Sequence, residues 1–121
     1  MYLLICDATA AKAVQADLAA EVEVQLGAVV SLETASELRT GELPVCRDGS
    51  IRLLHFDEWL PALVDALDRH SSYLVQDGGQ LLLLVDRQSA ERILRRAPNL
   101  RSRLTDVFQI SPEDLSGEHP V

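Results

Sequence analysis

The stretch LLLLVDRQSAERILRRAPNLRSRLTDVF, residues 81–108, contains a strand, a helix and a second strand in close succession. The apolar run at its start predicts a strand from Gln80 to Val85 that is covered on both faces, because a strand with one exposed face alternates apolar and polar residues. The next apolar residues recur at helical spacing, which predicts an amphipathic helix that ends at Pro98. The residues of this helix expected to face the core are Ala90, Ile93, Leu94 and Ala97.

The rest of the chain repeats this alternation. Apolar or β-branched runs predict further strands at Tyr2 to Cys6, Ala28 to about Glu33, Ile51 to Phe56 and Val107 to Ile110. Residues 22–33 have two interpretations, because the alternation of Val22, Val24 and Leu26 also fits a strand. Two Gly and one Pro between Thr40 and Ser50 predict a long loop.

Two more helices are predicted in the first half of the chain. One follows the first strand, and the other follows the third strand, where Asp57 is expected to cap the helix and Pro61 to lie in its first turn. The sequence Asp77-Gly78-Gly79 is expected to stop the second of these helices. The predicted buried positions are Ala11, Val14, Leu18 and Val22 in the first helix and Leu60, Leu63, Val64, Leu67 and Leu74 in the second.

Uniformly apolar strands that alternate with helices predict a single three-layer, Rossmann-like α/β domain. Its sheet is expected to be mostly parallel, with about five strands flanked by helices. The domain is expected to span residues 1–110. Residues 111–121, SPEDLSGEHPV, are polar and acidic and are expected to form a tail or the start of a linker. The Met1 start and this acidic end fit a stand-alone protein better than a domain cut from a longer chain.

The composition limits the classes of partner. The chain of 121 residues has 47% hydrophobic residues, which indicates a globular domain, and a net charge of -8, which argues against a nucleic-acid partner. Its apolar runs are too short for a membrane span, and the N-terminus lacks the features of a signal peptide. The two cysteines, Cys6 and Cys46, lack the spacing of a zinc or redox site, so the expected location is the cytoplasm.

Acidic residues follow or end the predicted strands. Because the carboxyl ends of parallel strands meet at one edge of the sheet, Asp7, Glu33, Asp57 and Asp86 are expected to line that edge. One hypothesis for the function is therefore a metal- or phosphate-responsive switch that uses Asp7, Asp57, Glu58 and Asp86 with a divalent cation, if these carboxylates converge.

Two known kinds of site are matched only in part. The strand ending in Asp57-Glu58 resembles the second nucleotide-binding strand of a P-loop NTPase. However, the first strand is followed by Lys12 without the glycines and hydroxyl of a phosphate-binding loop, since Cys6, Ala11 and Ala13 occupy those places. The chain also resembles a response-regulator receiver domain, with Asp7 and Asp57 in acidic positions but without the hydroxyl and Lys that sense a phosphoryl group. This pattern fits a pseudo-receiver. No catalytic residue, cofactor or metal is predicted.

Six arginines lie between Arg87 and Arg103 on a chain that is otherwise acidic. Long arginine side chains can simply cover the edge of the core and extend into solvent. They can also bind carboxylates on a partner through paired hydrogen bonds. The predicted partner-binding residues are Arg92, Arg95, Arg96, Arg101 and Arg103.

From Leu60 to Phe108 the chain resembles a small α/β domain associated with bacterial STAND-type and NACHT-type ATPase proteins. The family pattern is an apolar strand, a helix ending in Arg-Arg-Ala-Pro-Asp-Leu, and then Trp-Ser-Trp-x3-Val-Phe. The corresponding residues here are Leu81 to Val85, Arg95-Arg96-Ala97-Pro98-Asn99-Leu100, Ser102 and Val107-Phe108. Two features depart from the pattern: Arg101 and Arg103 replace the two tryptophans, and Val85-Asp86-Arg87 replaces a Trp-Leu-Pro turn.

The resemblance implies a non-enzymatic adaptor or sensor in a bacterial defence or signalling system. Its expected partner is a protein, for example a STAND ATPase, a protease or another effector. A homo-oligomer is also compatible with the sequence, whereas neither a nucleic acid nor a membrane is expected as a partner.

Overall fold

A computed structural model describes residues 1–39 and 41–110. Five parallel strands form one sheet in the order β2-β3-β4-β1-β5, which confirms the predicted fold class. The strands are β1 (Tyr2–Ile5), β2 (Val30–Thr34), β3 (Ile51–His55), β4 (Gln80–Val85) and β5 (Asp106–Gln109). The α-helices are α1 (Ala11–Leu26), α2 (Pro61–Arg69), α3 (Arg87–Arg96) and α4 (Pro98–Arg103), and short 3-10 turns are η1 (Ala8–Ala10), η2 (Ala35–Glu37) and η3 (Ser71–Tyr73).

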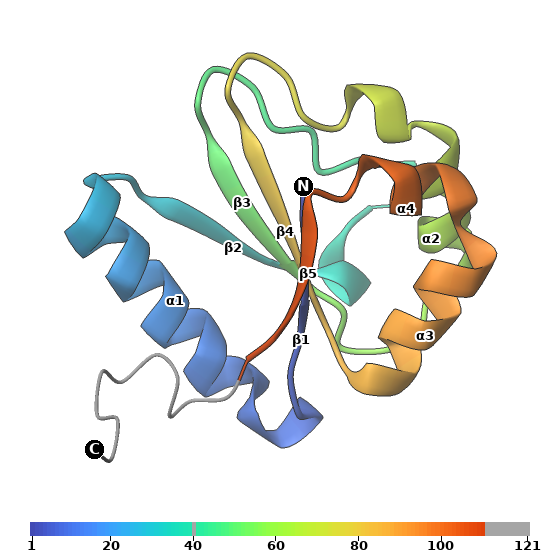
Figure 1. Ribbon diagram of the computed structural model, residues 1–121, viewed down its shortest axis with the longest axis horizontal. Helices are drawn as coiled ribbons and strands as arrows, with labels where there is room; N and C mark the ends of the chain where they lie inside the picture. The colour runs from blue at the N-terminus through green and yellow to red at the C-terminus, as the bar shows by residue number, and fades with distance from the viewer. Residues whose placement is uncertain (40, 111–121) are drawn as a thin grey trace.

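The sheet is the middle of three layers. Figure 1 shows α1 on one side of the sheet and α2, α3 and α4 on the other. Successive side chains of a strand point to opposite faces, so Leu3 belongs to the larger core under α2, α3 and α4, whereas Leu4 belongs to the smaller core under α1. Both faces of the central strands are therefore apolar, as the uniform run in β4 predicts.

The order of the strands determines which helix covers which face. From β1 to β2 the chain moves across the sheet in one direction, and from β2 through to β5 it moves in the other. Because crossover connections are right-handed, a reversal of direction places the connecting helix on the opposite face. The neighbouring strands β1 and β4 are thus followed by helices on opposite faces, and this is the place where ligands bind in open α/β sheets.

The first helix, α1, extends to Leu26, beyond the point where the strand interpretation of residues 22–33 would have ended it. Val22, Val24 and Leu26 all lie in α1, and the strand alternative for these residues is wrong. The helix ends because Gly27 adopts φ 64°, a left-handed conformation that residues with a side chain rarely adopt, and its N–H donates to Glu23 O. The second strand then begins at Val30.

The second predicted helix is corrected at both ends. Asp57 does not cap α2, which begins at Pro61 without a side-chain cap; instead, the carboxylate of Asp57 accepts hydrogen bonds from the N–H and the hydroxyl of Ser36. The helix ends at Arg69, well before Asp77-Gly78-Gly79, and the separate turn η3 brings Leu74 into the core. Since Pro is favoured in the first turn of a helix, Pro98 starts α4 as well as ending α3.

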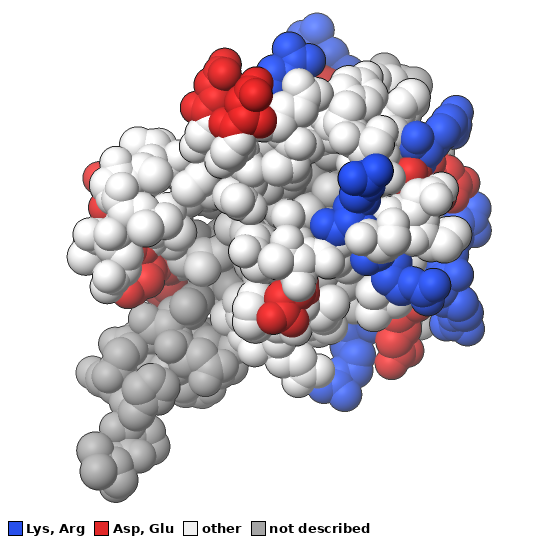
Figure 2. Space-filling view, turned by 45° about the horizontal axis from the view of Figure 1, so that its top comes forward, with Lys and Arg blue, Asp and Glu red and all other residues white. Residues whose placement is uncertain are grey.

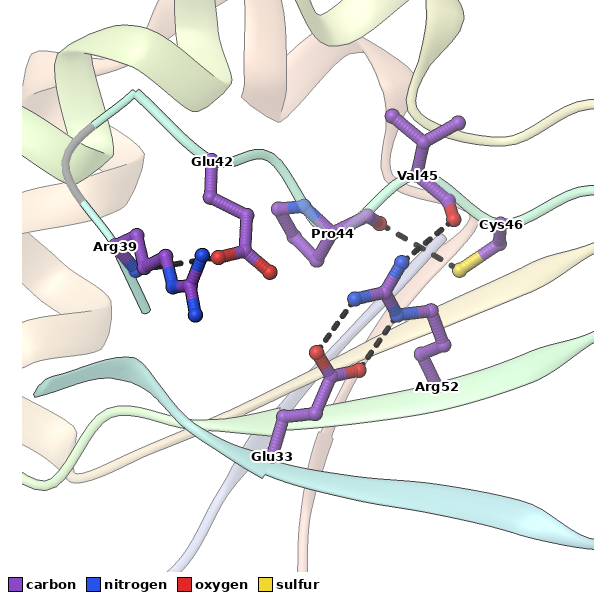
Figure 3. Close-up of polar contacts among 7 residues, drawn as sticks. All are labelled: Glu33, Arg39, Glu42, Pro44, Val45, Cys46 and Arg52. Atoms are coloured by element: carbon purple, nitrogen blue, oxygen red, sulfur yellow. Dashed lines mark hydrogen bonds and ion pairs between the residues drawn. The ribbon is translucent and has the colours of Figure 1, made fainter. Parts of the chain in front are cut away.

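The loop between β2 and β3 is anchored on the sheet by a partly buried ion pair (Figure 3). Arg52 of β3 donates two hydrogen bonds to the carboxylate of Glu33 on β2 and a third to Val45 O in the loop. Cys46, next to Val45, is fully buried and exchanges backbone hydrogen bonds with the segment before β4. Glu33 is therefore inside a strand and paired, and the expectation that it lines the carboxyl edge is wrong.

None of the helices in the described part of the chain is both long enough and apolar enough to cross a membrane. The proposed tail, residues 111–121, lies outside the described residues.

Candidate functional site

A crevice of about 480 Å³ lies at the carboxyl ends of β1, β4 and β5. It is at the point where the connections from β1 and β4 leave toward opposite faces of the sheet. Its volume is within the range of small-molecule sites in proteins. The polar residues that line it are Asp7, Asp86, Arg87, Gln88 and Gln109, and Cys6 and Ile5 contribute to its inner wall.

Both carboxylates of the crevice have structural roles. Asp7 follows β1 directly and accepts hydrogen bonds from the N–H and the hydroxyl of Thr9, which hold the pKa of Asp7 below its ordinary value. Asp86 follows β4 and caps α3 by accepting a hydrogen bond of 2.7 Å from Ser89 N. In each case the second carboxylate oxygen has no hydrogen bond within residues 1–39 and 41–110.

The side chains that line the crevice include both hydrogen-bond acceptors and hydrogen-bond donors. Its carboxylates accept hydrogen bonds, whereas Arg87, Gln88 and Gln109 have side chains that donate them. Cys6 is a poor nucleophile because burial, followed by the charges of Asp7 and Asp86, raises the pKa of its thiol. The site is therefore suited to binding a polar small molecule.

The four carboxylates of the hypothesised divalent-cation switch, Asp7, Asp57, Glu58 and Asp86, do not form one group. Asp7 and Asp86 share the crevice, but Asp57 and Glu58 are not part of its lining, and Asp57 is engaged by Ser36. Among the described residues, no three His, Cys, Asp or Glu side chains form a group that could hold a metal ion. The convergence that a divalent-cation site requires is thus not found in this part of the chain.

The two partial resemblances can be compared with the geometry. The link from β1 to α1 is the turn η1, in which Thr9 N donates to the Asp7 side chain and Ala10 N to Asp7 O. Two N–H groups that would face an anion in a phosphate-binding loop are therefore used internally. Receiver domains have the strand order 2-1-3-4-5, whereas β1 here lies between β4 and β5, so Asp7 and Asp57 follow strands that are not neighbours.

The five predicted partner-binding arginines lie on α3 and α4, and we call them the basic surface: Arg92, Arg95, Arg96, Arg101 and Arg103. Figure 2 shows basic side chains gathered on the right of the molecule, the side of these helices, whereas the left side, where α1 lies, shows red and white but no blue.

Three arginines of the basic surface are held by contacts within the chain. Arg96 forms two hydrogen bonds of 3.0 Å with the carboxylate of Asp65 on α2. Arg101 donates to Leu94 O at 3.1 Å, and the guanidinium of Arg92 lies 5.4 Å from the centre of the Trp59 ring. Each guanidinium nevertheless keeps donors for a partner, since it has five N–H groups.

The other two arginines differ. Arg95 and Arg103 are exposed and make no side-chain hydrogen bond or ion pair with the rest of the described chain. Both helices that carry them are anchored to α2: Asp65 accepts the hydrogen bonds of Arg96 in α3, and Asp68 accepts a hydrogen bond of 2.9 Å from Leu100 N in α4. Asp65 and Asp68, which anchor α3 and α4, were not predicted from the sequence; their spacing of three residues on one helix is the signal that could have identified them.

The comparisons with known proteins give no family for this chain: neither a family model nor a curated protein nor a solved structure matches it. The resemblance to a domain of STAND-type proteins therefore stays a prediction.

Proposed function

We propose that this chain is a non-enzymatic protein-interaction module whose contact surface is the basic surface of α3 and α4. The observation that carries the proposal is the combination of held and unpaired guanidinium groups on a fixed pair of helices. Arg96 is oriented by Asp65 before any partner arrives, so less conformational entropy is lost on binding. Arg95 and Arg103 keep all their donors for the partner.

The expected partner presents carboxylates. A guanidinium binds a carboxylate through two parallel hydrogen bonds, which gives specificity as well as affinity. The net charge of -8 on the whole chain repels a nucleic acid at long range. Within the described residues, one cation–π contact is found on the basic surface, that of Arg92 with Trp59, whereas single-stranded nucleic acids are bound by several stacked aromatic residues.

For the biological setting we propose an adaptor or sensor in a bacterial STAND-type defence or signalling system. The support is the spacing of the motif in residues 81–108, and the partner would be the ATPase, a protease or another effector. Arg101 and Arg103, which stand where the family pattern has tryptophans, are both exposed on α4, where a partner can reach them.

Two matched variants test the surface. Arg95→Ala/Arg103→Ala removes two positive charges from the basic surface, and Arg39→Ala/Arg47→Ala removes the same charge from exposed positions elsewhere. Both are used with wild type to capture partners from the native lysate, and the affinity of a captured protein is then measured by calorimetry. We expect the first variant to bind the partner at least about tenfold more weakly, which corresponds to a loss of about 1.4 kcal/mol in binding free energy. The control is expected to bind like wild type.

Equal binding by all three proteins would contradict the surface assignment. Equal loss in both variants would also contradict it, since binding would then depend on net charge rather than on these helices.

A second candidate function is supported by the crevice between β1 and β4. Its position at the reversal of the strand order and its two carboxylates fit a ligand rich in hydroxyl groups, such as a nucleoside, because carboxylates at this edge bind ribose hydroxyls in related sheet architectures. Adenosine is a suitable probe. If the crevice binds it, backbone NMR signals of Asp7, Asp86 and Gln109 shift on titration, and Asp7→Asn weakens the response while Asp57→Asn does not. No shift at these residues up to millimolar adenosine would contradict this second candidate function.

A further inference from the structure

The two outer layers of the molecule carry opposite charge. The helices α3 and α4 contain six arginines, namely the basic surface and Arg87, against the single acidic residue Glu91. The helix α1 contains Asp17, Glu21 and Glu23 against the single basic residue Lys12. Because α1 packs on one face of the sheet and α3 and α4 on the other, the opposite charges lie on opposite sides of the domain (Figures 1 and 2).

The outer side of α1 also carries a stripe of exposed apolar residues. Helical spacing places Ala13, Ala16, Ala20 and Val24 in one stripe on this side, and all four are exposed. Val24 has 79% of its surface accessible to solvent. A solvent-facing helix side is normally polar, whereas here small apolar residues run along the middle, and the exposed carboxylates of Asp17, Glu21 and Glu23 lie beside them.

We propose that the outer side of α1 is the docking site for the basic surface of a second copy of this chain. This inference rests on the proposed function, since it names a partner for that surface. The small side chains let another helix approach closely, and the flanking carboxylates can then pair with Arg95 and Arg103, which have no polar partner in the described part of their own chain.

The contact is heterologous, because the two surfaces differ and lie on opposite sides of the same domain. After two copies have joined, one acidic α1 side and one basic surface are still unoccupied. Such an interface continues into a ring or an open filament rather than ending at a dimer.

The overall repulsion between two chains of charge -8 opposes association at long range. At physiological ionic strength this repulsion is screened beyond about 8 Å, while ion pairs in direct contact are screened much less. We therefore expect assembly to occur at physiological salt and to weaken at high salt.

Sedimentation velocity of full-length variants tests the inference. The first variant, Asp17→Asn/Glu21→Gln/Glu23→Gln, neutralises the α1 side and keeps the basic surface. The second, Arg95→Gln/Arg103→Gln, weakens the basic surface and keeps the α1 side. Arg39→Gln/Arg47→Gln is the control, and circular dichroism verifies that each variant is folded.

Wild type and the control are expected to form species larger than a dimer as concentration rises, and each of the first two variants to stay monomeric. An equimolar mixture of those two variants is expected to form a dimer and nothing larger, because only one functional surface of each kind is present. A wild type that stays monomeric at every concentration overturns the inference, as does an assembly that either variant leaves intact. The proposed function survives that result if the arginine variant still loses an acidic partner from the lysate.

Discussion

Arg52 on β3 forms a two-pronged ion pair with Glu33 on β2, and both side chains are largely shielded, with 23% and 19% of their surfaces accessible. The same guanidinium also holds Val45 O of the loop at 2.8 Å. Arg52→Met would leave the Glu33 carboxylate without its partner. Because breaking a fully buried pair costs about 3–5 kcal/mol and this pair is partly solvated, we expect a loss of about 1–3 kcal/mol in the free energy of unfolding by urea.

The double variant Glu33→Gln/Arg52→Met provides the control for this prediction. It removes both charges, so no carboxylate is left uncompensated, and it is expected to be more stable than Arg52→Met alone. A double variant that is less stable than the single one would show that the cost comes from lost packing rather than from the orphaned charge.

Asp57 gives a prediction for acidic pH. Partial burial on its own would raise the pKa of Asp57, but the two hydrogen bonds from Ser36, together with the backbone N–H of Asp57 and the charge of His55, outweigh it, and the pKa lies below its ordinary value. A lowered folded pKa stabilises the protein above the unfolded pKa of about 3.9, and this contribution is lost as pH falls through the folded pKa. Ser36→Ala is expected to destabilise by about 0.5–1 kcal/mol at neutral pH.

The difference between wild type and Ser36→Ala should shrink as pH falls below the unfolded pKa of about 3.9 and through the lowered folded pKa of Asp57, because the carboxylate is then progressively protonated. Urea unfolding at a series of pH values measures it. A difference that stays constant down to the lowest pH would mean that the Asp57 charge is not involved.

His55 gives a prediction for the range just below neutral. Burial lowers the pKa of His55 despite the opposing charge of Asp57. Between the lowered folded pKa and the unfolded value of about 6.5, the unfolded chain binds more protons, so the free energy of unfolding falls as pH decreases through this window. His55→Gln is expected to flatten the pH dependence there, as measured by urea unfolding from about pH 7.5 to 5. If the pH dependence of the free energy of unfolding is the same in His55→Gln as in wild type, it arises from another titratable group.

Gly79 is predicted to be intolerant of a side chain. A Cβ atom at this position would lie 2.6 Å from Cys46 O, a buried backbone atom that accepts a hydrogen bond from Gln76 N. Gly79→Ala must displace this segment and is expected to cost about 1–3 kcal/mol in unfolding free energy.

Gly41→Ala is the comparison for Gly79→Ala. A Cβ atom at residue 41 would meet nothing within 4 Å, so the cost comes only from the left-handed backbone conformation, φ 83°. This cost is about 1 kcal/mol. If the two variants are equally stable, the close approach of Gly79 and Cys46 is not what limits the position.

The sequence predicted the strands better than it predicted the site. The strands β1, β3 and β4 are short, mainly apolar runs, which made them easy to recognise, whereas the alternation at residues 22–26 also fitted a strand and misled. Which carboxylates belong to the candidate site depends on hydrogen bonds between residues that are far apart in the sequence. Asp57 was expected at an edge site and as a helix cap, yet it bonds to Ser36, 21 residues earlier in the chain. Nothing local in the residues around Asp57 indicates that partner.

The sequence by itself determined that the chain forms alternating strands and helices, with apolar strands covered on both faces. The spacing of apolar residues along the sequence indicates both the type of element and the faces that are buried. Only the tertiary structure decided the strand order. That order places β1 beside β4, brings Asp7 and Asp86 to one crevice and separates Asp57 from them. It also places the arginines of α3 and α4 and the carboxylates of α1 on opposite faces of one sheet. The direction of each crossover determines the face that its helix covers, and no local sequence pattern encodes that direction.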